Sequence, residues 1–359
     1  MSKFESYFKK LIAGENLSFV DKLCFLILRL IGAIYALIMY LRSFFYAIGI
    51  FRSYKLPKPV ISVGNITMGG TGKTPTVAWL ARHFINRGKE VVVLTRGYGG
   101  SLEGETLVVS DGIKRILLPE EAGDEPCLLA DMTPGLIVVM GSNRYEAGSL
   151  AIKQFQPDIF ILDDGFQHMK LKRDLNILLI DYAKPFGNGF TFPAGTLRES
   201  LSAIKRSDIL LFTRCEENRK PNVKIPWNIP AFTSSHRLCG VKKLVGGAIV
   251  DFEHLKGKIG VAFAGIAKPD EFFDSLETEG LNIVATLTFS DHTEYGEEEI
   301  AALAKLLKSS KADYLITTAK DGIKLHGEDG EDYPCYVALL ELEVNEEGLF
   351  LERVEKVIA

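Results

Sequence analysis

The sequence predicts an α/β protein with a mostly parallel sheet that is flanked by helices. Three observations predict this class. Short apolar runs alternate with helical patterns along most of the 359 residues, as in strand–helix–strand units. A glycine-rich turn at 69–72 joins one apolar run to a helical pattern. Charged and polar residues directly follow several runs, at the edge where open α/β sheets bind ligands.

The first 52 residues are apolar and basic. Apolar runs at 23–28, 30–41 and 44–51 are interrupted by Arg29, Arg42 and Arg52. No uncharged run reaches the ~20 residues that cross a bilayer. We therefore expect a helical segment in the headgroup region of an anionic leaflet, with its arginines on phosphates. A buried helical hairpin is the alternative, and the acidic, polar leader argues against a signal peptide.

Residues 69–75, Gly-Gly-Thr-Gly-Lys-Thr-Pro, follow the apolar run 60–63 and predict a phosphate-binding loop. Lys73 would reach the outer phosphates of ATP, and the Thr74 hydroxyl would ligate Mg2+. Backbone N–H groups and the start of the next helix would surround the phosphates; they belong to Gly69, Gly70, Thr71 and Gly72. These features predict a sheet of the P-loop NTPase type.

The loop departs from the usual pattern at one position. Thr67 stands where the first glycine is expected, and Met68 excludes the variant in which a second lysine precedes the glycines. The alternative is a glycine-rich turn that holds no ligand.

Six apolar runs in the first two thirds of the chain predict core strands, at 60–63, 91–94, 136–140, 159–162, 175–180 and 209–212. Helical patterns lie between them at 76–84, 125–131 and 144–155. The runs 107–109 and 116–118 flank Asp111-Gly112 and predict an inserted hairpin. A polar, proline-bearing stretch at 216–230 predicts a boundary. Strands at 259–264, 283–287 and 314–317 and helices at 269–276 and 297–307 follow it.

Acidic residues stand at two places where such a sheet would use them. Asp163 and Asp164 follow the run 159–162, and an acid at a strand end holds magnesium in nucleotide sites. A strand-ending turn is the alternative, and the sequence leaves open which aspartate is the direct ligand. Asp124 and Glu125 precede a helical pattern, where Asp124 could also be a simple helix cap. Asp291-His292 follows another strand-like run and is equally ambiguous.

The composition fits a reducing, cytosolic compartment. Five cysteines are scattered without a C-x-x-C pair, which indicates neither a disulfide framework nor a zinc site. The net charge of −4 divides into +6 for residues 1–60 and −10 for the rest. The acidic body argues against nucleic acid as a partner, and no obligate protein partner is evident.

Taken in order along the chain, these motifs resemble the tetraacyldisaccharide 4′-kinases, which phosphorylate a lipid A precursor at the cytoplasmic face of the Gram-negative inner membrane. The string Asp-Asp-Gly-Phe-Gln-His at 163–168 is the most specific piece. The other matching segments are 64–65, 69–75, 96–99, 123–126, 143–144, 193–199, 291–292 and 317–321. Ala319 departs from the glutamate that is usual before Lys320.

The resemblance implies roles for the candidate residues. Asp124 would accept the proton of the acceptor hydroxyl, paired with His292, and Lys73 would act on the β- and γ-phosphates. Glu125 would add to the surroundings of the metal. Substrate binding would involve Arg144, Arg198, Glu199 and Asn65, with the arginines on phosphate.

The resemblance also implies an organisation. Residues 1–52 would form membrane-associated helices, 53–235 the kinase domain, and 236–359 a second α/β domain that closes over the nucleotide. The substrate would be an acylated glucosamine disaccharide 1-phosphate, and the protein would be peripheral or monotopic on the membrane. Two other functions stay open at this point. One is a membrane-recruited P-loop ATPase switch, and the other is a soluble small-molecule kinase whose N-terminal helices are core.

Overall fold

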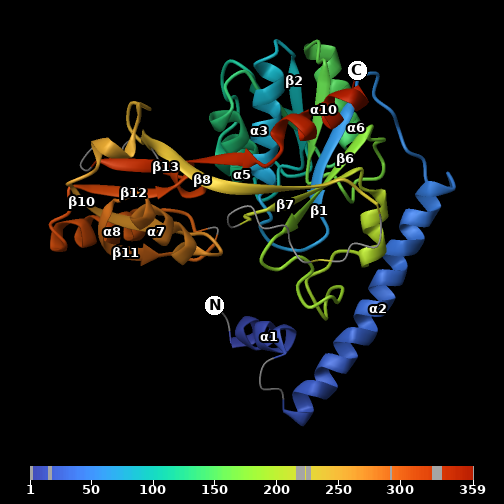
Figure 1. Cartoon of the computed structure of the whole chain (residues 1–359), viewed down its shortest axis with the longest axis horizontal. Helices are drawn as coiled ribbons and strands as arrows, with labels where there is room; N and C mark the ends of the chain where they lie inside the picture. Colours follow the sequence, from blue (N-terminus) through green and yellow to red (C-terminus); the bar gives the residue numbers. More distant parts are fainter. Residues whose placement is uncertain are drawn as a thin grey trace.

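The computed structural model describes residues 3–14, 18–215, 223, 228–291, 293–325 and 334–358. Its centre is a 13-stranded sheet in the order β11-β10-β12-β13-β8-β7-β6-β1-β5-β2-β4-β3, with β9 (Ile249–Val250) paired to β8. Figure 1 shows two groups of strands and helices that are joined by the long strands β8 and β13. The mostly parallel, helix-flanked sheet confirms the predicted fold class.

The six apolar runs of the first group all form strands, paired in parallel with one another. They are β1 (Val60–Asn65), β2 (Val91–Thr95), β4 (Ile137–Met140), β5 (Ile159–Asp163), β6 (Leu175–Asp181) and β7 (Ile209–Thr213). Helices cover both faces of a parallel sheet, so its strands are apolar throughout rather than alternating. The predicted helices are also present, as α3 (Lys73–Ile85), α5 (Asp124–Met132) and α6 (Arg144–Gln154).

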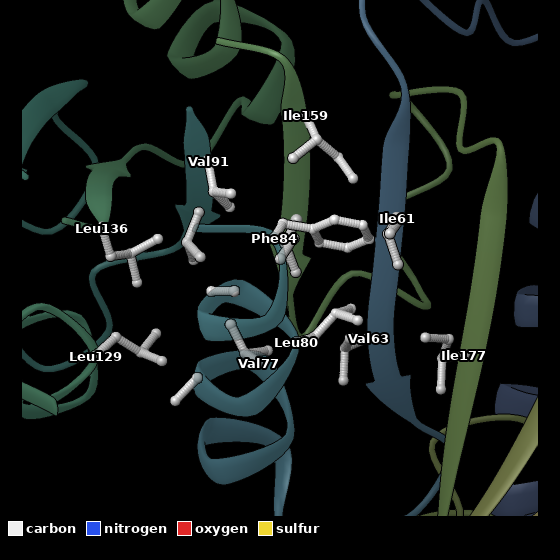
Figure 2. Packing of buried hydrophobic residues seen from close by; sticks show 14 of the residues in the cluster. Ile61, Val63, Val77, Leu80, Phe84, Val91, Leu129, Leu136, Ile159 and Ile177 are labelled. Atoms are coloured by element: carbon white, nitrogen blue, oxygen red, sulfur yellow. The ribbon is translucent and has the colours of Figure 1, made fainter. Parts of the chain in front are cut away.

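Helix α3 packs directly on the strands that precede and follow the predicted phosphate loop. Figure 2 shows Val77, Leu80 and Phe84 of α3 facing Ile61 and Val63 of β1. All five side chains are buried. Each such side chain contributes about 1.5–3 kcal/mol when it is fully removed from water. This contact fixes the start of α3 against the end of β1.

The predicted hairpin is only half present. Strand β3 (Leu107–Asp111) ends in a turn in which the Asp111 carboxylate accepts from the N–H groups of Ile113 and Lys114, at 2.9 and 2.8 Å. Residues 116–118 form no strand; they lead into the short helix α4 (Pro119–Ala122). The antiparallel partner of β3 is β4, so β3 extends the edge of the main sheet.

In the second group, the predicted elements form β10 (Ile259–Ala264), α7 (Pro269–Thr278), β11 (Asn282–Thr288), α8 (Glu297–Ser309) and β12 (Tyr314–Thr318). The short helix η2 (Phe252–His254) precedes β10, and α9 (Ala319–Gly322) follows β12. A further short helix, η1 (Leu201–Arg206), precedes β7 in the first group. Strand β8 (Ala231–Lys243) pairs with β7 through its first residues and with β13 (Cys335–Val344) through the others. The predicted boundary between residues 235 and 236 therefore falls inside β8. Most of the stretch 216–230 lies outside the described residues.

The C-terminal helix returns to the first group. Helix α10 (Glu347–Ile358) places Phe350 against Trp79 and Phe232, with ring centroids 5.7 and 5.2 Å apart. Phe350 is fully buried. Residues far apart in the sequence thus share one core.

The N-terminal segment forms α1 (Lys3–Ala13) and one continuous helix, α2 (Phe19–Ala47). Ser18 and Asp21 form a capping box that begins α2, and the Tyr7 hydroxyl donates to Asp21 at 2.5 Å. The arginines do not interrupt the helix, because arginine is a good helix former. Its most apolar window has a mean hydropathy of 2.2 and is 6% buried. By length and composition it is the one helix of the described residues that could cross a membrane, and its exposure contradicts the buried hairpin.

We expect Gly64→Ala to destabilise the fold. A Cβ at Gly64 would lie 2.7 Å from the backbone nitrogen of Phe166, closer than a van der Waals contact allows. Overpacking of this kind costs about 1–3 kcal/mol. Urea unfolding of the variant measures the loss. The control is Gly348→Ala in α10, where a Cβ would meet nothing within 4 Å. An unchanged stability of the Gly64 variant would contradict the described packing.

Candidate active site

The predicted phosphate loop lies at the carboxyl end of β1, and protein contacts hold its shape. Gly69 and Gly72 have φ of 104° and 77°, in the region that favours glycine. The Asn65 amide donates to the Thr71 hydroxyl at 2.8 Å, and the Thr213 hydroxyl donates to the Thr71 carbonyl at 2.9 Å. The N-cap residue of α3 is Gly72, which has no side chain to cap the helix. Its first N–H groups are therefore available to an anion.

Lys73 and Arg198 both face Asp164. Lys73 Nζ lies 3.8 Å from Asp164 Oδ1, and Arg198 Nη1 donates to both carboxylate oxygens at 3.0 and 2.8 Å. Burial opposes ionisation of Asp164, but Lys73 and Arg198 outweigh it and keep its pKa below the usual range. Asp164 has φ of 51°, a strained conformation of the kind found at functional sites. The loop and Asp164 thus lie together at one edge of the sheet.

Asp163 is the more buried of the two aspartates, at 2% exposure. Its Oδ2 accepts from the Thr95 hydroxyl at 3.3 Å, and its Oδ1 has no partner in the described part of the chain. Burial, together with the charges of Glu125 and Asp164, raises its pKa well above the usual range. A buried carboxylate of this kind is stabilised by a nearby cation.

Arg144 supplies positive charge beside the acidic pair. It is 4% exposed, and Nη1 donates to the Gly141 carbonyl at 2.7 Å. Burial lowers its pKa to about 10, against the opposing effect of Asp163 and Asp164. It therefore remains a cation at neutral pH.

Asp124 lies in the first turn of α5 and contacts the second group of strands and helices. Its Oδ2 is 3.2 Å from Nζ of Lys324, which also donates to the Thr293 carbonyl at 3.1 Å. Lys320 Nζ lies 2.8 Å from Oδ1 of Asp291. His292 itself lies outside the described residues. The two residues that flank it are nevertheless held by the segment that contains Lys320 and Lys324, and this segment contacts Asp124.

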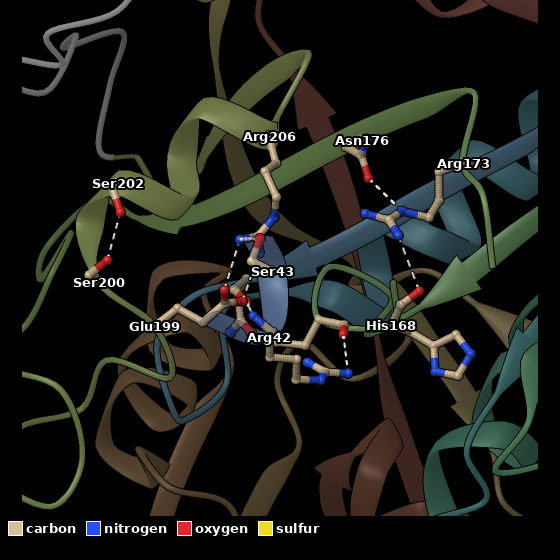
Figure 3. A network of polar contacts seen from close by, with 11 residues as sticks. Arg42, Ser43, His168, Arg173, Asn176, Glu199, Ser200, Ser202 and Arg206 are labelled. Carbon is tan, nitrogen blue, oxygen red and sulfur yellow. Dashed lines mark hydrogen bonds and ion pairs between the residues drawn. The ribbon is translucent and has the colours of Figure 1, made fainter. Parts of the chain in front are cut away.

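Two predicted substrate-binding residues make internal contacts instead. Both oxygens of Glu199 accept from Arg206 at 2.8 Å, and Glu199 is 3% exposed. Figure 3 shows this pair next to Ser43 of α2, whose hydroxyl accepts from Arg206 at 3.3 Å. Asn65 is fully buried, and its amide supports Thr71 of the loop. In this structure Glu199 therefore fixes Arg206, and Asn65 fixes the phosphate loop.

Helix α2 is attached close to the same site. Arg42, which is labelled in Figure 3, donates to the Gln167 carbonyl at 3.2 Å. The Gln167 amide donates to the Asn65 carbonyl at 2.9 Å. Thr191 donates to the Gly32 carbonyl at 2.8 Å, in the middle of the helix. The apolar helix is therefore fixed beside the edge of the sheet that carries the loop.

Sequence reasoning missed four polar residues of the site: Thr95, Asp181, Arg214 and Lys324. The first three share a recognisable signal, because each ends or directly follows a parallel strand, as Asp164 does. Lys324 has no such signal. Only the approach of its segment to α5 brings it to Asp124.

Comparisons with known proteins agree with this geometry. The family model LpxK, tetraacyldisaccharide-1-P 4′-kinase, matches residues 24–359. The chain is 49% identical over 336 residues to a tetraacyldisaccharide 4′-kinase of Geobacter sulfurreducens, which covers 94% of each chain. It is equally similar to that of Geobacter metallireducens, over 94% of this chain and 100% of the relative. A crystal structure of LpxK from Aquifex aeolicus in complex with ATP matches with a TM-score of 0.77 and 33% identity, over 92% of this chain and 98% of that one.

Proposed function

The chain belongs to the tetraacyldisaccharide 4′-kinase family, and we propose that its phosphate loop and Asp124 act on opposite sides of the transferred phosphoryl group. The reaction transfers this group from ATP to the 4′-hydroxyl of a tetraacyldisaccharide 1-phosphate in lipid A synthesis. The observation that carries this proposal is the arrangement of Lys73 and Asp164 at the loop, with Asp124 held by Lys324. Phosphoryl transfer depends mainly on positioning and charge neutralisation.

The loop binds the donor. Backbone N–H groups at the start of α3 and the ammonium of Lys73 contact the β- and γ-phosphates. Lys73 is already directed to this position by Asp164. A cation at the γ-phosphate stabilises the negative charge of the transition state, which is spread over its oxygens.

The acidic residues fit Mg2+. Oδ1 of Asp163 is buried and has no partner among the described residues, and Asp164 stands next to Lys73. The described residues contain no group of three or more His, Cys, Asp or Glu side chains that could hold a metal ion without help from a ligand. Magnesium at phosphates typically uses only one or two carboxylates. Asp163, Asp164 and Thr74 would hold the ion, with Glu125 nearby, and when bound it would neutralise charge on the phosphates.

Asp124 acts as the base. Its carboxylate accepts the proton of the 4′-hydroxyl as that oxygen forms a bond to the γ-phosphorus and the bond from phosphorus to the leaving ADP oxygen breaks. Lys324 holds one carboxylate oxygen, and His292 orients the base from the second domain. Closure of residues 236–359 over the nucleotide brings these groups together.

Arg144 and Arg198 bind phosphate groups of the substrates. Arg198 now grips the carboxylate of Asp164 with two hydrogen bonds, and the same fork geometry suits a phosphate. Arg198 would turn from Asp164 toward the transferred group or the 1-phosphate of the acceptor, which would leave the carboxylate of Asp164 free to hold Mg2+.

Helix α2 brings the enzyme to its substrate, at the cytoplasmic face of the bacterial inner membrane. The acyl chains are costly to remove from lipid, at about 0.8 kcal/mol per methylene. Apolar side chains of α2 remain exposed on the protein. Arg29 is also exposed and would meet anionic headgroups, whereas Arg42 holds the helix to the body through Gln167. Because α2 is attached beside the loop, docking places the active site over the headgroup.

We expect the triple variant Leu30→Gln, Ile34→Gln and Leu37→Gln to bind anionic vesicles at least tenfold more weakly. These three side chains, spaced by four and three residues, share one face of α2 and are 60%, 61% and 55% exposed. Each loses about 1.5–3 kcal/mol of transfer free energy at full burial. Vesicle cosedimentation measures binding. The matched control changes Ile113 and Ile249 to Gln, because both are exposed outside α2. Equal binding of the two variants would exclude α2 as the membrane contact.

The direct test of the activity uses purified protein, labelled ATP and a tetraacyldisaccharide 1-phosphate in mixed micelles. We expect a labelled product phosphorylated at the 4′ position. ATP hydrolysis without a labelled lipid would instead support an ATPase switch. Equal transfer to a water-soluble acceptor after removal of residues 1–50 would support a soluble small-molecule kinase.

A further inference from the structure

Arg214 has an unusual backbone conformation next to the phosphate loop. It directly follows β7 and has φ of 58°, a left-handed backbone conformation that residues other than glycine rarely adopt. Strained residues of this kind persist where surrounding contacts demand them. The family resemblance assigns no role to this residue.

The side chain of Arg214 joins the loop to a second strand end. Nη2 donates to the Gly70 carbonyl at 2.7 Å, and Nη1 donates to Oδ2 of Asp181, the last residue of β6, at 3.1 Å. Asp181 is 14% exposed and Arg214 is 31% exposed. The ion pair fixes the guanidinium on the outer side of the loop.

Arg214 and its neighbour Thr213 hold two successive carbonyls of the loop. Thr213 donates to the Thr71 carbonyl, and Arg214 donates to the Gly70 carbonyl. In a trans peptide the C=O of one residue and the N–H of the next point in opposite directions. Drawing the Gly70 carbonyl outward therefore turns the Thr71 N–H toward the opposite side, where the phosphates bind. In the same way Thr213 orients the N–H of Gly72.

His236 lies beside the loop and carries no charge. His236 of β8 lies close to Gly72, since a Cβ there would be 3.0 Å from the His236 ring. Burial and the charge of Arg214 lower the pKa of His236 to about 4, so this imidazole is neutral at physiological pH. Among the described residues, the ion pair of Arg214 and Asp181 therefore supplies the charge next to Gly70.

We propose that Arg214 is a positioning residue for the triphosphate: it orients the Thr71 N–H through the Gly70 carbonyl, and Asp181 holds its guanidinium in place. The proposal rests on the assigned role of the loop in ATP binding. It accounts for the strained backbone, because such a conformation persists where contacts demand it, and here Arg214 contacts both Gly70 and Asp181. It also makes Asp181 a part of the nucleotide site without contact to the nucleotide.

The test uses the full chain with Arg214→Gly, and the dissociation constant of ATP is measured by calorimetry. Glycine relieves the left-handed strain, so the melting temperature should not fall, whereas the ATP dissociation constant should rise at least fivefold. Arg214→Lys should recover part of the affinity, because one ammonium donor can still reach Gly70. Asp181→Asn should weaken ATP binding in the same direction. KM for the lipid should not change in any of these variants.

The matched control is Lys311→Gly, which relieves a left-handed residue with φ of 49° after α8, away from the loop. It should leave ATP affinity unchanged. A rise of less than fivefold for Arg214→Gly, while the unmodified protein binds ATP, overturns the proposal. The proposal is also overturned if Lys311→Gly raises the ATP dissociation constant as much as Arg214→Gly does, or if Arg214→Gly raises the KM for the lipid. Either result would show a general structural effect. Failure of the unmodified protein to bind ATP would instead contradict the proposed function.

Discussion

Replacing Asp124 by Asn is expected to lower kcat by about 10²- to 10⁴-fold, the range for loss of a general base. The amide has the shape of the carboxylate but cannot accept the proton of the 4′-hydroxyl. The contact with Lys324, 3.2 Å away, is weakened but can be kept by the amide oxygen. The KM for ATP should change little, because Asp124 lies outside the phosphate loop. Steady-state kinetics in mixed micelles measure both constants.

Asp131→Asn is the control for this experiment. Asp131 is in the same helix, α5, and pairs with Arg115 at 2.9 Å. The substitution removes the same charge from the same helix, yet kcat should remain near that of the unmodified enzyme. A kcat of the Asp124 variant within tenfold of the original would show that another group takes the proton.

The second large effect is expected for Lys73→Met, which should lower kcat/KM by about 10²- to 10³-fold, as for loss of one preorganised charge donor. Methionine fills a similar volume without the ammonium, so the γ-phosphate loses a cation that Asp164 directs toward it. Binding of ATP should weaken, and the rate at saturating ATP should also fall. Calorimetry and steady-state kinetics separate the two effects.

Lys89→Met is the control for Lys73→Met. Lys89 is exposed beyond the end of α3, so loss of its charge should leave both constants unchanged. If Lys73→Met retained more than a tenth of the original kcat/KM, the assignment of residues 69–74 as the catalytic phosphate loop would be untenable.

Much of the sheet could be predicted because its strands are locally distinctive. Most of the parallel strands are buried on both faces and appear as continuous apolar runs, whereas the edge strand β11 alternates between exposed and half-buried residues. Strand β10 has the predicted bounds. Strands β8 and β13 were not predicted. Each carries polar and charged residues among its apolar ones, and they stabilise each other across about a hundred residues of sequence. Similarly, 116–118 is apolar enough for a strand, but Pro119 begins α4 immediately after it.

Candidate site residues could be predicted where a polar or charged side chain directly follows an apolar strand. The loop, Asp163 and Asp164 lie at adjacent strand ends because β1 and β5 are neighbours in the sheet. Glu199 carried the right chemistry for a substrate residue, but its charge is neutralised by Arg206. No local pattern marks that pairing. The role of His292 stays a prediction, because it lies outside the described residues.

Local composition was therefore sufficient for the strands of the first group, for β10, β11 and β12, and for the apolar character of α2, since each depends on residues that are close in sequence. For the same reason it could predict a phosphate loop and an acidic pair. Folding alone decided which side chains meet across the sheet: Lys324 at Asp124, Arg206 at Glu199, and Arg214 at Gly70. It also decided that α2 is one exposed helix fixed beside the loop. Hydrogen bonds and ion pairs act over a few ångströms, so contacts between distant residues exist only after the order and register of the strands are established.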